Sequence, residues 1–151
     1  MNKRSRARQI AMQCLYQMHL VKAALDDALV YFQDQEDPPA DVLKMAREMA
    51  DGAFTHRTEI DVVIRRHLHN WDFERVGQVE RAILRLGVYE LLHEPKTPPK
   101  VALNEAIELA KEFTTSKSVR FVNGVLDKVA REREPKKPPV PKRPSAPSRS
   151  K

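Results

Sequence analysis

The sequence predicts an all-α fold, a compact bundle of six to seven helices arranged as two helical sub-bundles. Apolar residues recur with the 3.6-residue period of a helix over most of the chain. Only four glycines occur, and long alternations of β-branched residues are missing. With 151 residues, the chain is long enough for one domain with a substantial core.

Proline and short polar residues mark the ends of the expected helices. Pro38, Pro39, Pro95, Pro98 and Pro99 stand at boundaries, because proline cannot continue a helix. The segment "TTSKS" offers Ser and Thr caps between the last two helices. The expected helices are residues 4–20, 25–35, 40–54, 56–69, 76–93, 99–114 and 117–132.

Positive charge is concentrated in the last residues of the chain. Residues 134–151 hold six Lys or Arg and one acid, which is +5 of the net charge of +6, and six of the eleven prolines. We therefore expect residues 1–133 to form the domain and residues 134–151 to form a disordered Pro/Lys/Arg-rich basic tail. Two roles stay open for the tail, a solvated extension and an arm that binds nucleic acid.

The sequence indicates a cytoplasmic protein without a membrane partner. No apolar signal segment is present at the N-terminus, and no apolar run approaches the roughly 18 residues of a membrane span. A single cysteine, Cys14, excludes an internal disulfide and a multi-cysteine metal site, which fits a reducing compartment.

The first helix begins with cations and no acid. In "KRSRARQIAMQCLYQ", Lys3, Arg4, Arg6 and Arg8 all precede Asp26, the first acid of the chain. A helix N-terminus favours carboxylates, because its unpaired N–H groups carry partial positive charge. No acid at i+4 offsets the repulsion among these cations. We therefore expect negative charge from outside the helix, supplied by a ribonucleotide strand.

The rest of this helix divides into two faces. The buried stripe is expected to contain Ala7, Ala11, Cys14, Leu15 and Met18. The opposite face carries hydrogen-bonding groups, among them Gln9, and one aromatic residue, Tyr16. Tyr16 is either exposed on this face or packed under a neighbouring helix.

The segment "VGQVERAILRLGVYELL" (76–92) is apolar on nearly all sides and predicts the central helix. Gly87 costs about 1 kcal/mol relative to Ala in a helix interior, which indicates close approach of another backbone. Glu80 falls within an apolar arc, and a buried carboxylate needs a partner. That partner is either an internal Arg or a second protein.

The last helix combines cations with one aromatic ring. In "SKSVRFVNGVLDKVAR", the core face is expected to hold Val119, Val122, Val125, Leu126 and Val129. The other face gathers Lys117, Arg120, Phe121, Gly124, Lys128 and Arg131. A ring among cations suits stacking of an unpaired base with phosphates held nearby. The alternative is that Phe121 lies at the edge of the core among ordinary surface charges.

No pattern for catalysis, a cofactor or a metal is visible. The chain lacks a phosphate-binding glycine loop, a G-x-S-x-G elbow and an HExxH pair. Its five histidines form no i, i+4 pair, and we expect them at the surface or at helix ends. In "PPKVALNEAIELAKEF", three glutamates face outward, opposite an apolar face that ends at Phe113, but no His or Asp joins them. We expect a protein that is not an enzyme.

Four segments carry a family resemblance: "RARQIAMQCLYQ", "VERAILRLGVYEL", "VALNEAIELAKEF" and "FVNGVLDKVAR". Together, in this order, they resemble the NusB family of transcription antitermination factors. The likeness is dense over 4–20 and 70–131. It implies an all-α fold of two sub-bundles, binding to single-stranded boxA RNA of ribosomal RNA transcripts with the ribosomal protein NusE, and action on the RNA polymerase elongation complex. Family RNA contacts map onto Arg4, Arg6, Arg8 and Phe121, and Tyr16 and Glu80 map to the partner or RNA edge.

The leading hypothesis is an RNA-binding antitermination factor whose RNA-binding residues are Lys3, Arg4, Arg6, Arg8, Gln9, Lys117, Arg120, Phe121 and Lys128. Lys117 departs from the acidic or small residue of many relatives, and the tail has no family counterpart. Two other readings stay open. One is an RNA-targeting helical domain related to that of ribosomal RNA methyltransferases, and the other is a protein-binding helical adaptor.

Overall fold

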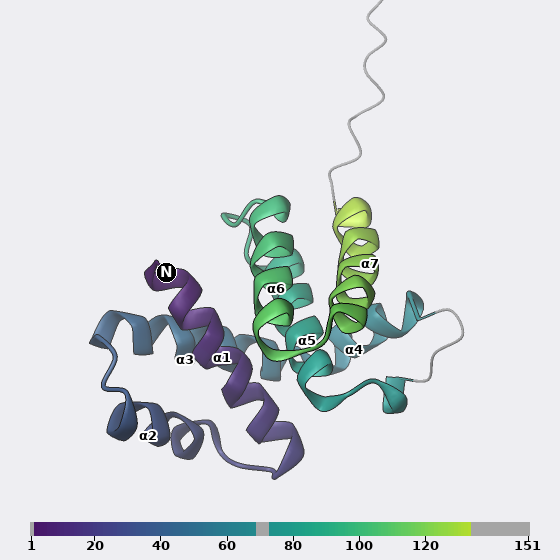
Figure 1. The fold of residues 1–151 in the computed structure, drawn as a ribbon. Helices are drawn as coiled ribbons and strands as arrows, with labels where there is room; N and C mark the ends of the chain where they lie inside the picture. The colour runs from purple at the N-terminus through teal and green to yellow at the C-terminus, as the bar shows by residue number, and fades with distance from the viewer. Residues whose placement is uncertain (1, 69–72, 134–151) are drawn as a thin grey trace, which may run out of the picture.

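The computed structural model describes residues 2–68 and 73–133 (Figure 1), so the expected tail lies outside the described residues. These ranges contain seven α-helices and one short 3₁₀ helix, η1. Their bounds are α1 Lys3–Leu20, α2 Leu25–Gln35, α3 Ala40–Thr55, α4 Arg57–Arg66, η1 Phe73–Arg75, α5 Gln78–His93, α6 Pro99–Phe113 and α7 Ser116–Arg133.

One expected helix is too long. The sequence predicted a helix over 56–69, whereas α4 ends at Arg66. The N–H groups of His67 and Leu68 donate to the carbonyls of Ile64 and Arg65, three residues back, so the helix tightens and stops. Every other expected boundary lies within two residues of the observed one.

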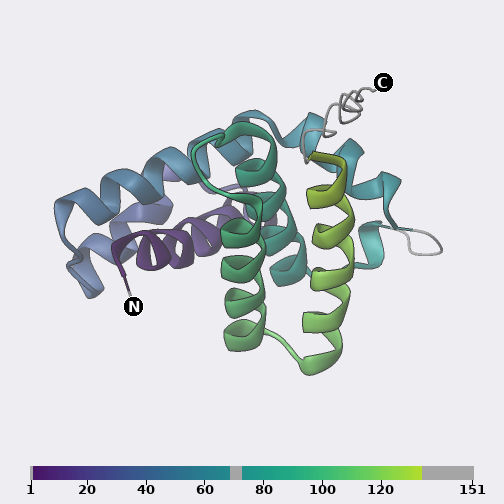
Figure 2. The ribbon, with the colours of Figure 1, turned by 90° about the horizontal axis from the view of Figure 1, so that it is seen from above.

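The helices form two sub-bundles that share one core, as the sequence predicted. Helices α1 to α3 form one group, α5 to α7 form the other, and α4 follows α3 to pack against α5 and α7 (Figures 1 and 2). Helix α1 joins the groups, because it packs against both α3 and α5. None of the helices in the described ranges is long and apolar enough to span a membrane.

Helix α5 is the central helix, also as predicted. Every residue from Ala82 to Leu91 is buried. Gly87 makes room for a side chain and not for a backbone, which corrects the prediction. A Cβ atom there would lie 2.9 Å from a methyl carbon of Leu126 on α7 and 3.6 Å from the Cβ atom of Ala106 on α6. The missing side chain therefore lets the second sub-bundle close.

The expected core faces are largely confirmed. The stripe of α1 is buried, and burial raises the pKa of the Cys14 thiol to about 12. On α7, Val122, Val125, Leu126 and Val129 are buried. Phe113 is wrong as a core residue, since 36% of it is exposed. It is the last residue of α6, so no further turn covers its ring.

Candidate nucleic-acid interface

The cations at the start of α1 mostly meet carboxylates of the same molecule. Asn2 caps the helix, its side-chain oxygen accepting from the Ser5 backbone N–H at 2.7 Å. Lys3 Nζ lies 2.7 Å from Asp41 Oδ2 of α3, and the Arg6 guanidinium pairs with Glu36 after α2. Negative charge does come from outside the helix, but these two cations are not uncompensated as predicted.

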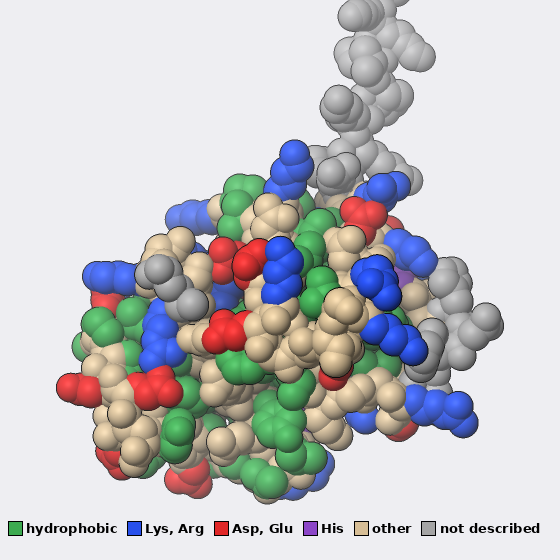
Figure 3. Space-filling view, viewed as in Figure 1, with side chains coloured by type: hydrophobic (Ala, Val, Ile, Leu, Met, Phe, Trp, Pro, Cys, Tyr) green, Lys and Arg blue, Asp and Glu red, His purple; other side chains and the backbone are tan. Residues whose placement is uncertain are grey.

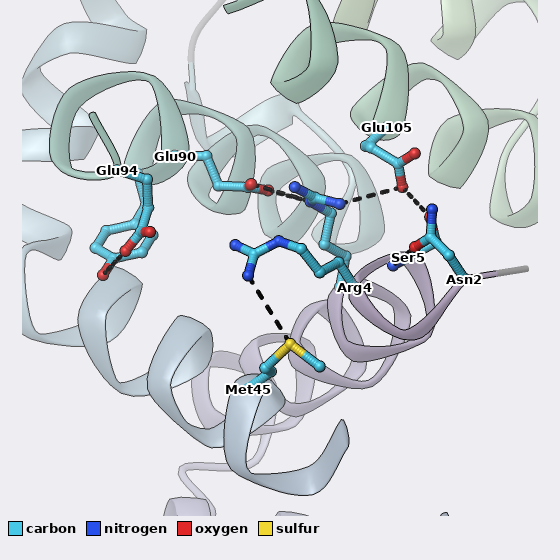
Figure 4. A network of polar contacts seen from close by, with 9 residues as sticks. Asn2, Arg4, Ser5, Met45, Glu90, Glu94 and Glu105 are labelled. Atoms are coloured by element: carbon cyan, nitrogen blue, oxygen red, sulfur yellow. Dashed lines mark hydrogen bonds and ion pairs between the residues drawn. The ribbon is translucent and has the colours of Figure 1, made fainter. Parts of the chain in front are cut away.

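Arg8 departs furthest from the prediction. Only 3% of its side chain is exposed, and its Nε donates to both oxygens of Glu90 on α5, at 2.9 and 2.8 Å. Its Nη1 lies 3.5 Å from Glu105 of α6, which also accepts from the Ser5 hydroxyl at 2.7 Å (Figure 4). Burial opposes the charged form, yet the Glu90 and Glu105 carboxylates outweigh it and raise the pKa of Arg8.

Arg4 is the exception among the four. It is exposed, and its only hydrogen bond among the described residues is a weak one to the sulfur of Met45, at 3.9 Å (Figure 4). Together with Lys3, and with Lys96 from the loop between α5 and α6, it lines an open groove of about 760 Å³. The three cations bring positive charge to this groove, although the Glu94 and Glu105 carboxylates also line it.

The polar face of α1 is covered. Gln9 is buried, accepts from Arg6 at 2.8 Å and donates to Glu112 of α6 at 2.8 Å. Tyr16 is half-buried and packs against the core, which favours the second of its two expected placements. Helix α1 is therefore enclosed on more sides than a two-faced helix would be.

Phe121 lies where the core meets a surface cavity. It is half-buried against the core and lines an open cavity of about 280 Å³. The other lining residues come from α7, from the start of α5, and from the end of η1 and the loop after it: Arg75, Val76, Gly77, Glu80, Lys117 and Ser118. Core packing and access to a ligand are thus both present at this ring.

Glu80 belongs to the same cavity, and no Arg among the described residues pairs with it. Its Oε2 accepts from the Ser118 hydroxyl at 2.6 Å. Its other oxygen approaches the Cα of Gly77, where an added Cβ would lie 2.3 Å away. The internal Arg pair expected for Glu80 is wrong, and the carboxylate instead joins the first turn of α5 to the first turn of α7.

The outer face of α7 carries exposed cations. Lys117, Arg120 and Lys128 are exposed, and within the described ranges neither Lys117 nor Arg120 has an ion-pair partner. A Cβ at Gly124 would meet nothing within 4 Å, so the space above it is open. Figure 3 shows Lys and Arg side chains gathered over α7 at the right of this face.

The two predicted basic clusters lie on opposite sides of α6. Figures 1 and 2 both place α6 between α1 and α7. The outward residues of α6 include Glu105, Glu108 and Glu112, which contact Ser5, Lys111 and Gln9 respectively. The positive surface is therefore interrupted, and α7 holds the part of it with the fewest internal ion pairs.

Sequence reasoning missed the buried acid–base pairs. Besides Arg8 and Glu90, the buried Arg85 of α5 makes two hydrogen bonds to Asp61 of α4, at 2.8 and 3.0 Å. A signal was present, because both Glu90 and Arg85 lie on the helix predicted to be central and apolar on nearly all sides. Buried charges need partners of opposite sign.

The sequence of this chain is similar to proteins of one known family. A model described as the NusB family matches residues 5–131. The transcription antitermination protein NusB of Myxococcus xanthus (strain DK1622) is 42% identical over 134 residues, covering 86% of this chain and 96% of that protein. The protein of the same name from Anaeromyxobacter sp. (strain Fw109-5) is 46% identical over 129 residues, covering 85% and 90%.

Solved structures agree with the sequence comparison. The structure of T. maritima NusB matches with a TM-score of 0.80 and 36% identity, covering 90% of this chain and 95% of that chain. A chain in a crystal structure of the antitermination factors NusB and NusE in complex with dsRNA matches with a TM-score of 0.79 and 31% identity, covering 87% and 98%. The resemblance in the four sequence segments is confirmed, and the chain belongs to the NusB family.

Proposed function

We propose that this protein is a transcription antitermination factor that binds boxA RNA of ribosomal RNA transcripts together with a NusE ribosomal protein. In that role it helps the RNA polymerase elongation complex read through terminators. Membership of the NusB family supports this function, as does the match to a complex of NusB and NusE with RNA. As a regulator of transcription, it acts in the cytoplasm and catalyses no reaction of its own.

The outer face of α7 is the RNA surface we propose, with Lys117, Arg120, Phe121 and Lys128 as its contacts. The observation that carries this choice is the pair of exposed cations, Lys117 and Arg120, without ion-pair partners in the described ranges, beside a ring that lines an open cavity. Phosphates bind the cations with little loss of existing contacts, and a base stacks on the exposed part of Phe121.

The residues at the start of α1 contribute to RNA binding to different degrees. Arg4 is placed to bind phosphate directly, since no carboxylate among the described residues pairs with it. Lys3 and Arg6 bind RNA by exchanging a carboxylate for a phosphate. Gln9 lies at the edge of this surface. We assign Arg8 to positioning, because its guanidinium is enclosed between Glu90 and Glu105 and holds α1 against both sub-bundles.

The protein partner is assigned to the surface next to these residues. Tyr16 of α1 is only half-buried and is our candidate contact to NusE. Glu80 acts at the RNA edge by holding Ser118, and through it the start of α7. The domain that does this is residues 1–133, and residues 134–151 are proposed to be a basic tail outside it.

Competition binding tests the function. A labelled boxA-like RNA is displaced from the protein by unlabelled boxA-like RNA or by a scrambled sequence, with and without the NusE partner. We expect preference for boxA, increased by NusE. If four to six phosphates are neutralised, the slope of log K against log salt is about −3 to −4 on single-stranded RNA. Equal competition by the scrambled RNA in both conditions contradicts the proposal, and binding of NusE alone supports the adaptor reading.

A further inference from the structure

Three side chains of the kinds that bind metals meet where α3 and α5 end. His56 follows the last residue of α3, Glu59 lies in the first turn of α4, and His93 is the last residue of α5. His93 Nε2 lies 2.8 Å from Glu59 Oε1, and His56 Nδ1 lies 3.8 Å from the same oxygen. The expectation of no metal site considered histidines along one helix, whereas the fold brings these together across three.

The composition of this cluster suits a transition-metal ion. Two imidazoles and one glutamate are a set that holds zinc in sites that keep a further position for water. Zinc bound at about 2.0 to 2.2 Å in tetrahedral geometry separates its ligand atoms by roughly 3.3 Å. The three candidate ligand atoms here all lie within 4.8 Å of one another, which is within reach of that arrangement.

The local charge favours a cation. The carbonyl ends of α3 and α5 meet here and carry partial negative charge, and the Glu59 carboxylate offsets the partial positive charge of the α4 N-terminus, where His56 is the N-cap residue. Glu59 adds a formal charge. The neighbouring cation, Arg57, is held elsewhere: its guanidinium lies 4.0 Å from the centre of the Phe54 ring and donates to the Phe54 carbonyl at 2.8 Å.

The rings of the cluster stack on one another, and the cluster is open to solvent. The imidazoles of His56 and His93 stack with their centres 4.0 Å apart, and the Tyr89 ring stacks on His93 at 5.7 Å. The side chains of His56, Glu59 and His93 are 42%, 54% and 27% exposed, so an ion can enter. Because the two imidazole planes are nearly parallel, at 19°, one ring must turn about its Cβ–Cγ bond to aim at a shared ion.

We propose that His56, Glu59 and His93 bind one divalent transition-metal ion, with zinc as the expected ion. The bound ion ties the junction of α3 and α4 to the end of α5. This metal site is independent of the proposed function, since none of its three residues belongs to the RNA or partner surface described above.

Calorimetric titration of the untagged full chain with zinc chloride tests the site. We expect saturable binding of one ion and a higher unfolding temperature in its presence. Cobalt in place of zinc should give the visible absorption of a four- or five-coordinate ion. The double variant His56→Ala/His93→Ala should lose saturable binding. Glu59→Gln should weaken binding at least about tenfold, the lower limit found even for residues that only orient ligands.

His67→Ala is the matched control. It removes an imidazole outside the cluster, one that lies 3.2 Å from Glu132 of α7, and should bind zinc like the wild type. Circular dichroism without metal establishes that each variant is folded. Should the double histidine variant fail to fold, Glu59→Gln decides the result, because its side chain is largely exposed. Absence of saturable zinc binding by the wild type, or binding by the folded variants equal to it, overturns the proposal.

Discussion

The start of α1 and the outer face of α7 hold cations of the same kinds, but these cations differ in whether they pair with carboxylates. On α1, Lys3, Arg6 and Arg8 each have a carboxylate partner outside the helix. On α7, Lys117 and Arg120 have none in the described ranges. Helix α1 belongs to the first sub-bundle and also packs against the second, so it meets several acids, whereas α7 packs at an edge with one face in solvent.

This difference shows that the number of cations in a segment does not measure the positive surface that the segment presents to solvent. A cation that enters the interior with its carboxylate partner stabilises or positions, and one on an outer face remains available to phosphate. A variant of the buried Arg8 on α1 should therefore change stability, whereas variants on the outer face of α7 should change RNA affinity.

The largest effect should come from Arg8→Met. This change leaves the Glu90 carboxylate, which is 2% exposed, without its main partner, and should lower the free energy of unfolding by about 3 to 5 kcal/mol. Urea unfolding followed by circular dichroism measures it. The double variant Arg8→Met/Glu90→Leu should recover most of the loss, because no unpaired charge then stays buried. Wild-type stability of Arg8→Met would show that the pair has no structural role.

The next effect concerns the ring on α7. Phe121→Ala should reduce RNA affinity by about 1 to 3 kcal/mol if a base stacks there, measured by fluorescence anisotropy. Phe113→Ala is the control, since it removes an exposed ring from α6 outside the proposed surface. Because Phe121 also contacts the core, unfolding is measured on the same samples. Unchanged affinity of folded Phe121→Ala leaves only its role at the edge of the core.

Local sequence chemistry made the helices predictable, whereas tertiary packing decided which charged side chains form ion pairs. Proline pairs and the apolar period of α1 and α7 were sufficient for the boundaries and the buried stripes. The Arg8–Glu90 pair joins residues 82 positions apart, so no local period contains it. The cluster of His56, Glu59 and His93 likewise exists only after three helices are placed.

The polar face of α1 also shows what a helical period does not predict. Its Gln and Tyr residues follow a helical period that left two placements open for Tyr16, on an exposed face or under a neighbouring helix, and the structure buries Gln9 against α6 and half-buries Tyr16. A hydrogen-bonding face looks the same in sequence whether water or another helix satisfies it. The RNA-binding role of each predicted residue stays a prediction for the measurements described here.

A smaller effect separates the two basic clusters by salt dependence. Lys117→Ala/Arg120→Ala should make the slope of log K against log salt less negative by about 1.4, because each phosphate contact contributes about 0.7 on single strands. Lys3→Ala/Arg6→Ala should change the slope less, since Asp41 and Glu36 already occupy these cations. Binding measured over a salt series on one RNA compares them, and an equal change for both double variants contradicts the distinction between α1 and α7.

The smallest effect is the most local one. Lys3 donates a hydrogen bond to Asp41 and lowers the pKa of that carboxyl below its ordinary value of 3.8. A lowered carboxyl pKa adds stability that is present above the ordinary value and is lost as pH falls through the folded value. Lys3→Ala should therefore return the pKa of Asp41 toward 3.8 with almost no change in stability at neutral pH, because both side chains are exposed. An NMR titration of the Asp41 carboxyl carbon measures this shift in pKa, and Lys3→Arg should preserve the low value. Adding RNA to the wild type should also raise the pKa of Asp41 if a phosphate takes Lys3 from Asp41, whereas an unchanged titration would mean that Lys3 stays with its carboxylate and does not bind RNA.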